Sequence, residues 1–310
     1  MRVAVVDMGT NSTRLLVADV GDHEVTEIER ESRVTGLGRG VDTSGQLATD
    51  AIDDVCGAVG DYIRRYEELG AERVTAIATS AVRDADNSSA FTAELRERFA
   101  LDSRILSGRE EAWLTYRGAS FGRTSAEGSL VVDIGGGSTE LIVGSKDELG
   151  FFASLQAGTV RQTERHLTRD PADASELEEL ATDVRGLIDA ELSGRALVSA
   201  EHGIAVAGTP TSLAAIDLGL DPYDAEAVHG HVLGLPTIQR MCSELATMTL
   251  EERLAVTGLH PGRAPTIVAG VVILIGVMRA FGLSEIEVSE HDILYGVALE
   301  AAGDNGSARH

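Results

Sequence analysis

The sequence predicts two α/β domains built on one plan, because one strand–turn–strand pattern occurs twice along its 310 residues. The copies are Asp7-Met-Gly-Thr-Asn-Ser-Thr13 and Asp133-Ile-Gly-Gly-Gly-Ser-Thr139, with Asp, Gly, Ser and Thr at identical offsets. Apolar runs flank each copy, as expected for two strands joined by a tight turn. A third strand and then alternating helices and strands follow each hairpin. We therefore expect two domains of ribonuclease-H type that face each other across a cleft.

Hydrophobic spacing predicts the elements of the first half in order. Three strands are expected at residues 3–6, 14–19 and 25–30, followed by a Gly-rich loop at 35–45. Residues 50–69 carry one apolar stripe at helical spacing, which predicts an amphipathic helix. The other expected elements are a buried strand at 74–79, a helix at 90–99, a short strand at 104–106 and a helix at 109–121.

The second half repeats the opening hairpin at residues 130–143 and adds a third strand near 151–155. The further expected elements are a helix at 176–192, a strand at 204–207, helices around 213 and 238 and over 267–281, a strand at 286–289 and a helix at 293–301. We expect one domain to comprise residues 1–124 together with the C-terminal helix at 293–310. The other domain is expected to comprise residues 125–292.

Composition limits the possible partners. The net charge of −24 is expected to repel nucleic acid and anionic membranes, so neither is a predicted partner. The apolar stretch at 267–278 is too short to cross a bilayer and predicts a buried helix. No signal peptide is recognisable at the N-terminus, and Cys56 and Cys242 are too few for a disulfide framework. We therefore expect a cytoplasmic protein with reduced cysteines.

Each Gly-rich turn predicts an anion-binding nest, because successive backbone N–H groups can converge on one point. A third close-approach turn opens a helix at Gly208-Thr209. The candidate phosphate-binding residues are Gly9, Thr10, Asn11 and Ser12, then Gly135, Gly136, Gly137, Ser138 and Thr139, then Gly208 and Thr209. Carboxylates suit a hard Mg²⁺ ion, with Mn²⁺ as an alternative, so the candidate metal ligands are Asp7, Asp133 and Glu140. Alternatively, each Asp only caps its own turn.

Hydrolysis requires a general base, and the best candidate follows Ser107. Ser107 and Glu110 have capping-box spacing, which leaves Glu111 to point elsewhere. Arg83 follows a predicted buried strand and is placed to bind a phosphate oxygen. The alternatives are that both glutamates are surface charges and that Arg83 pairs with Asp84 or Asp86.

Two histidine-containing segments carry side chains that could take part in metal binding or acid–base chemistry. His229 and His231 have the spacing of a metal pair, but no third ligand is evident, and incidental loop histidines are the preferred interpretation. The segment from Ser289 to His291 and Asp292 resembles part of an acid–base set. No nucleophile elbow accompanies it, so it does not predict a hydrolase triad.

Four motifs together resemble the exopolyphosphatase / guanosine pentaphosphate phosphatase (Ppx/GppA) family of the actin, sugar kinase and Hsp70 superfamily. They are the turn at 7–14, the run at 79–83, the segment at 107–112 and the turn at 132–141. By motif matching, the resemblance assigns the catalytic base to Glu111 and phosphate binding to Arg83. It assigns the metal and phosphate turn to Asp133, Gly135, Gly136, Ser138 and Glu140. Pro265 departs from the family pattern, so nothing is transferred to that stretch.

The resemblance implies a metal-dependent exopolyphosphatase acting on inorganic polyphosphate. The alternatives are hydrolysis of the 5′ γ-phosphate of guanosine pentaphosphate, a polyphosphate- or nucleotide-binding sensor without turnover, and a superfamily kinase. A base at Glu111 argues against a pure binding protein, which has no need of one. A homodimer is expected by family analogy alone.

Overall fold

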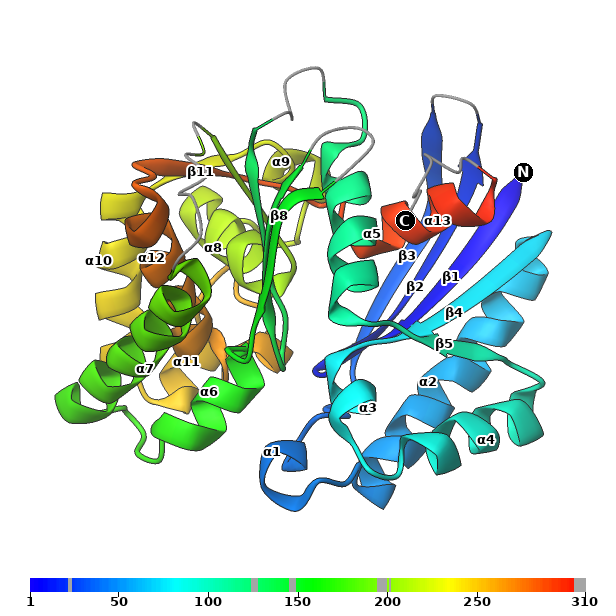
Figure 1. Cartoon of the computed structure of the whole chain (residues 1–310), viewed down its shortest axis with the longest axis horizontal. Helices are drawn as coiled ribbons and strands as arrows, with labels where there is room; N and C mark the ends of the chain where they lie inside the picture. Colours follow the sequence, from blue (N-terminus) through cyan, green and yellow to red (C-terminus); the bar gives the residue numbers. More distant parts are fainter. Residues whose placement is uncertain (22–23, 124–127, 145–148, 194–199, 201, 304–310) are drawn as a thin grey trace. The chain divides into compact units, whose positions relative to one another are not determined.

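A computed structural model describes residues 1–21, 24–123, 128–144, 149–193, 200 and 202–303. The chain divides into two compact units (Figure 1). Unit 1 comprises Met1–Thr124, Lys146–Glu148 and Asp292–His310, and unit 2 comprises Ser125–Ser145 and Leu149–His291. The expected boundary at residues 124 and 125 lies outside the described residues.

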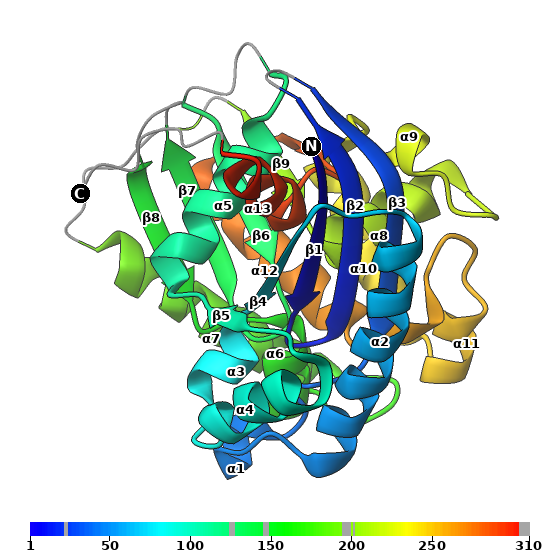
Figure 2. The same cartoon turned by 90° about the vertical axis from the view of Figure 1, so that its right-hand side faces the viewer.

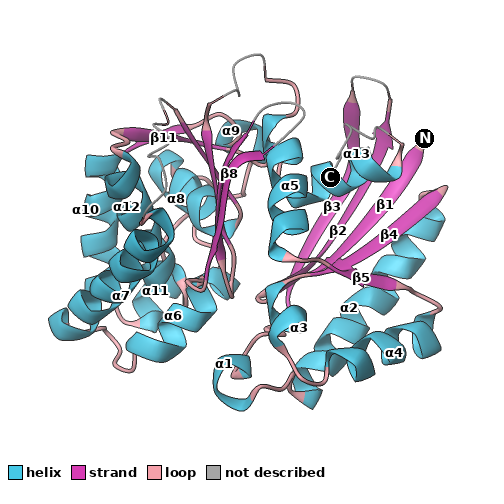
Figure 3. Ribbon diagram, viewed as in Figure 1, coloured by secondary structure: helices cyan, strands magenta, loops and turns pink. Residues whose placement is uncertain are grey.

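Unit 1 contains a five-stranded sheet in the order β3-β2-β1-β4-β5 (Figure 3). Its strands are β1 Arg2–Met8, β2 Ser12–Val20, β3 Val25–Val34, β4 Arg73–Ala78 and β5 Ser103–Ile105. The first three form an antiparallel meander, and β4 and β5 continue the sheet parallel to β1. This order confirms the predicted fold class for this unit.

Helices cover both faces of the unit 1 sheet, and the period of two along β1 decides which residues meet which helix. Ala4 and Val6 pack with α2 (Thr49–Glu68) and α4 (Ser88–Phe99). Val3 and Val5 pack with α5 (Gly108–Ser120) and α13 (Ile293–Ala301). The same alternation places Asp7 of β1 and its cross-strand partner Arg14 of β2 on the face of α5 and α13.

Helices α5 and α13 cross in close contact because each has a glycine at the crossing. A Cβ atom on Gly118 of α5 would lie 1.8 Å from the carbonyl oxygen of Asp292, and one on Gly296 of α13 would lie 1.8 Å from that of Leu114. Both obstacles are backbone atoms, which cannot rotate away. The crossing therefore fixes the distance between the helix that carries Glu111 and the segment that carries Asp292.

Gly118→Ala is accordingly expected to destabilise the protein by roughly 3 kcal/mol, because the new methyl group forces the helices apart. Urea denaturation measures the effect. Gly57→Ala in α2 is the matched control, since a Cβ atom at Gly57 meets nothing within 4 Å. That change should stabilise the helix by about 0.5–1 kcal/mol. Equal stability of the two variants would contradict the close crossing.

Unit 2 contains a six-stranded sheet in the order β10-β11-β9-β6-β7-β8, of which Figure 2 labels β6 to β9. Its strands are β6 Leu130–Ile134, β7 Thr139–Gly144, β8 Leu149–Leu155, β9 Gly203–Val206, β10 Val232–Gly234 and β11 Glu285–Val288. Strands β6 to β8 form the antiparallel meander, and β9 and β11 are parallel to β6. The plan of unit 1 thus recurs, which confirms the predicted fold class for the second half.

One large core lies between the unit 2 sheet and three helices, α7 (Ala174–Leu192), α10 (Leu235–Thr247) and α12 (Ile267–Phe281). Helix α12 is buried over most of its length, as predicted from its apolar sequence. Among the described residues, no helix combines the length and the apolar character that a membrane crossing requires.

Several short elements were not predicted, because they have no apolar stripe of their own. They are α1 Val41–Ser44, α3 Ser80–Asp84, α6 Thr159–His166, α9 Ala225–Val228, α11 Leu250–Leu254, the 3-10 turn Pro261–Arg263 and strand β10. Helix α8 spans Gly208–Leu218, around the predicted centre at residue 213. Helix α6 is mainly polar, and hydrogen bonds to the second Gly-rich turn hold its first turn in place.

Candidate active site

Each of the two Gly-rich turns contains a hydrogen bond at the same position. In the first turn the Gly9 N–H donates to the Ser12 carbonyl at 3.0 Å, and in the second the Gly135 N–H donates to the Ser138 carbonyl at 3.0 Å. The repeated sequence therefore folds into the same local structure in both units.

The strand register places different charges at equivalent positions of the two hairpins. Asp7 lies opposite Arg14 across β1 and β2, and Asp133 lies opposite Glu140 across β6 and β7. Both partners follow their Asp by seven residues. The first hairpin therefore balances its carboxylate with a guanidinium, whereas the second places two carboxylates side by side.

Arg14 joins the first hairpin to the last helix of unit 1. Its Nε and Nη2 donate to Asp7 Oδ2 at 2.9 and 2.6 Å, and its Nη1 is ion-paired with Asp292. Asp292 also caps α13, because its Oδ1 accepts from the Leu294 N–H at 2.9 Å. Sequence reasoning missed this buried network. The one sequence signal for it is that Arg14 follows Asp7 by seven residues, as Glu140 follows Asp133.

The two carboxylates around Arg14 have opposite pKa shifts. Burial raises the pKa of Asp7, and the two hydrogen bonds from Arg14 oppose that shift only in part. Burial acts on Asp292 in the same direction, but Arg14, Arg30 and the Leu294 N–H outweigh it, so its pKa is lowered. Asp7 Oδ1 is buried without a hydrogen-bond partner among the described residues. A proton or a cation is therefore accommodated more readily at Asp7 than at Asp292.

Buried polar atoms that lack a partner in the described part of unit 1 gather at the ends of β1 and β4. Four of the six such atoms lie there, namely Asp7 Oδ1, Asn11 Nδ2, Ser12 Oγ and Ser80 Oγ, whereas Ser103 Oγ and Arg123 Nη2 lie elsewhere in the unit. Met8 pairs with Ala78, so the first turn lies beside the segment that follows β4. Buried polar groups normally have hydrogen-bond partners, and a concentration of exceptions indicates a bound ligand or water.

Glu111 and Arg83 form the second part of the unit 1 site. Ser107 and Glu110 make the predicted capping box, which confirms that Glu110 folds back onto the N-terminus of α5. Glu111 is buried, with 7% of its surface exposed, and its Oε2 accepts from Arg83 Nη1 at 2.7 Å. The alternative partner Asp84 lies farther away, at 3.9 Å from Arg83 Nε. Burial raises the pKa of Glu111, and Arg83 opposes the shift in part.

In unit 2 the second turn is bound to the start of α6. The Thr159 and Val160 N–H groups donate to the Gly135 and Gly136 carbonyls, each at 2.9 Å. Arg161 Nε donates to the Gly137 carbonyl at 2.8 Å. These contacts occupy the carbonyls of all three glycines of the turn and fix its conformation against α6.

The third turn places Arg263 beside Gly208. A Cβ atom on Gly208 would lie 2.4 Å from Arg263 Cζ, so the guanidinium occupies the space of the missing side chain. Ala207 has a φ of 72°, a strained conformation of the kind found at ligand-binding turns. The motif comparison had transferred nothing to the stretch that contains Arg263, and only the fold brings it to Gly208.

The second hairpin places two carboxylates side by side. Asp133 and Glu140 are buried neighbours on one face of the sheet, where like charges repel. Glu140 Oε1 accepts from Ser154 Oγ at 2.8 Å, which orients the carboxylate. In the described part of the chain, no group of three or more His, Cys, Asp or Glu side chains is placed to hold a metal ion. Asp133 and Glu140 therefore offer an oxygen pair rather than a complete cage.

The histidines of unit 2 contact different partners. His231 Nε2 lies 3.0 Å from Asp217 Oδ2, whereas the ring of His229 stacks on that of His291 at 4.3 Å between centroids. His229 Nδ1 accepts from the Glu290 N–H at 3.2 Å. The spacing of His229 and His231 thus corresponds to two separate local contacts.

Comparison with known proteins gives one consistent result. The family model described as the Ppx/GppA phosphatase family matches residues 16–303. Exopolyphosphatase 2 of Mycobacterium tuberculosis is 37% identical, over 97% of this chain and 99% of its own. The crystal structure of an exopolyphosphatase-like protein has a TM-score of 0.90 at 32% identity, covering 97% and 98% of the two chains. That of an exopolyphosphatase from Cytophaga hutchinsonii has a TM-score of 0.88 at 26% identity, covering 98% of each.

Proposed function

The chain belongs to the Ppx/GppA phosphatase family, and from this premise we propose that it is an exopolyphosphatase that releases terminal orthophosphate from inorganic polyphosphate. The observation that carries the proposal is the group of unpartnered buried polar atoms in unit 1. Ser80, one of its members, begins the short helix that carries Arg83, which in turn contacts Glu111. Anion-binding groups and a buried carboxylate thus occur together in one unit.

The proposed reaction is attack of water on the terminal phosphorus. A P–O bond forms to the water oxygen, the bond to the bridging oxygen breaks, and the chain leaves one phosphate shorter. Glu111 accepts the proton that the water loses. Arg83 holds the Glu111 carboxylate at 2.7 Å and supplies positive charge beside the phosphoryl group. The N–H groups of the first turn orient the phosphate oxygens.

We propose Mg²⁺ as the cofactor, with Asp133 and Glu140 as its protein ligands. Their like charges at neighbouring strand positions support this assignment. The unpartnered Oδ1 makes Asp7 a candidate ligand as well. Bound Mg²⁺ would supply charge neutralisation for the phosphate chain.

Free cysteines at 56 and 242 support the proposed cytoplasmic location, and a homodimer stays a prediction of the family resemblance.

The pH dependence of turnover tests the role of Glu111. A base must be deprotonated, and burial raises the pKa of Glu111, so activity should fall with decreasing pH at values above those of an ordinary glutamate. Arg83→Gln removes the opposing guanidinium and should move this acidic limb to still higher pH. Glu110→Gln is the control, because its capping role gives it no part in the titration. A limb that stays in place in Arg83→Gln would argue against Glu111 as the titrating group.

Phosphate release from polyphosphate, guanosine pentaphosphate and ATP, assayed in parallel with and without Mg²⁺, tests the proposed function. We expect release from polyphosphate, dependent on Mg²⁺. Faster release from guanosine pentaphosphate would favour the alternative phosphatase. Binding of polyphosphate without release from any substrate would favour a sensor and overturn the proposal.

A further inference from the structure

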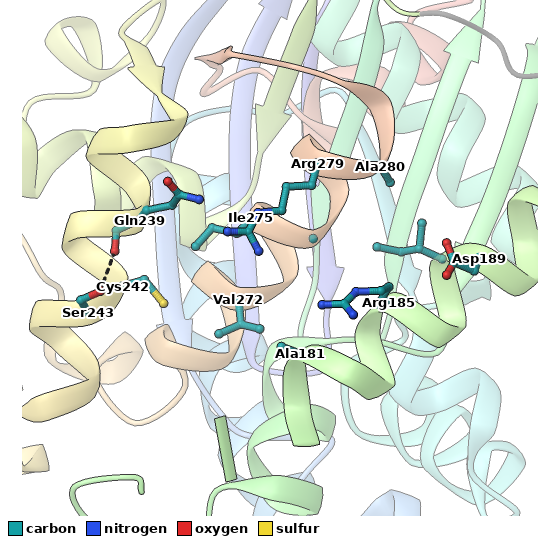
Figure 4. A pocket seen from close by; sticks show the side chains of 12 residues that line it. Ala181, Arg185, Asp189, Gln239, Cys242, Ser243, Val272, Ile275, Arg279 and Ala280 are labelled. Atoms are coloured by element: carbon teal, nitrogen blue, oxygen red, sulfur yellow. Dashed lines mark hydrogen bonds between the residues drawn. The ribbon is translucent and has the colours of Figure 1, made fainter. Parts of the chain in front are cut away.

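A cavity of about 460 Å³ lies among α7, α10 and α12 of unit 2 (Figure 4). Its volume is typical of small-molecule sites, which measure about 300–1,000 Å³. Each helix contributes residues at helical spacing, and on α12 these run from Val272 to Ala280. Ala181 and Ala280 contribute only methyl groups to its lining, and Gly276 contributes only backbone.

Two arginines, Arg185 and Arg279, line this cavity. In the described part of the chain, neither of them makes a hydrogen bond or ion pair, although the net charge of −24 leaves carboxylates in excess. Arg185 extends from α7 and Arg279 from α12, and Figure 4 shows both reaching over the cavity. Both side chains are exposed, so their donors are accessible to a ligand.

The charge balance of the cavity is positive although that of the chain is negative. Asp189 is the one carboxylate among the lining residues, against two guanidinium groups. Burial raises the pKa of Cys242, which also lines the cavity, to about 11. The thiol is therefore uncharged near neutral pH and does not offset the arginines.

The remaining lining is largely apolar. Val272 and Ile275 of α12 and Ile188 of α7 contribute hydrophobic surface, and Val272 and Ile188 are buried. An inorganic anion would leave this surface without a partner, and a neutral apolar molecule would leave the guanidinium groups without one. A ligand that satisfies both has an anionic group at one end and a hydrophobic body.

We propose that this cavity is a binding site for a small amphipathic anion, whose phosphate or carboxylate group contacts Arg185 and Arg279 and whose apolar body lies against Val272 and Ile275. The site is separate from the residues assigned to phosphate release. Ligands that have the same apolar body but carry either a phosphate or a carboxylate head group show which of these two groups the site binds.

Isothermal titration of the full chain with octyl phosphate, octanoate, octanol and inorganic phosphate tests the proposal. At least one of the two octyl anions should bind with 1:1 stoichiometry, and the tighter one identifies the head group. Octanol and inorganic phosphate should each bind at least about tenfold more weakly, since each lacks one half of the recognition.

Arg185→Gln and Arg279→Gln should each weaken the octyl anion about tenfold and leave phosphate release from polyphosphate unchanged. Arg240→Gln is the matched control, because Arg240 lies on α10 outside the cavity and pairs with Glu244. It should not affect binding. Absence of binding by both octyl anions, equal affinity for octanol, equal affinity for inorganic phosphate, or equal weakening by Arg240→Gln would each overturn the proposal.

Discussion

Glu111→Gln is expected to abolish phosphate release while leaving polyphosphate binding nearly intact. The amide keeps the size of the side chain and can still contact Arg83, but it cannot accept the proton of the attacking water. Loss of a general base costs about 10²–10⁴-fold in rate. Steady-state release of phosphate measures turnover, and equilibrium binding of polyphosphate measures affinity.

Glu110→Gln is the matched control for that experiment. Glu110 precedes Glu111 on the same helix, and its carboxylate is occupied by the Ser107 hydroxyl and backbone N–H. We expect a small loss of stability from the weaker cap and near-normal turnover. Undiminished turnover in Glu111→Gln would refute the assigned base. An equal loss in both variants would point to distortion of α5.

Arg14→Gln is expected to have the largest effect on stability. The change leaves Asp7 and Asp292 buried without their shared guanidinium, which should cost about 3–5 kcal/mol in the free energy of unfolding. Without the guanidinium, burial raises the pKa of both carboxyls in the folded state. The free-energy cost of burying them therefore applies at pH values where they would be ionised. The loss should therefore be smaller at about pH 5 than at about pH 8. Urea denaturation at both values measures it.

Two further variants separate the buried network from a general loss of charge. Arg96→Gln breaks an exposed pair with Asp102, which should cost at most about 1 kcal/mol. Asp292→Asn added to Arg14→Gln should restore part of the stability, because one buried charge is removed. A loss in Arg14→Gln no greater than that in Arg96→Gln, or no recovery in the double variant, would contradict a stabilising role for the network.

The strongly periodic parts of the fold were predictable from the sequence. The duplicated hairpins and the stripes of α2 and α7 follow from hydrophobic spacing, and the capping box at Ser107 follows from residue identity. Helix α6 was not predictable in this way, since a neighbouring turn stabilises it rather than an apolar stripe. Hydrophobic spacing predicts a helix or strand only where that element buries an apolar face of its own.

The candidate site was predictable only in part, for a related reason. Asp7, Arg83 and Glu111 follow strands or caps that can be recognised locally, and the structure places Arg83 against Glu111 as an ion pair. Their buried partners are remote in sequence. Asp292 reaches Arg14 through the packing of α13, and Arg263 reaches Gly208 through the packing of unit 2. The assignments to metal and phosphate stay predictions.

The central claim is that water, activated by Glu111, attacks the terminal phosphorus of polyphosphate. Hydrolysis in ¹⁸O-labelled water, followed by mass spectrometry of the products, tests it most directly. We predict one ¹⁸O atom in each released orthophosphate and none in the remaining chain. Label in the shortened chain, or orthophosphate without label, would contradict attack at the terminal phosphorus.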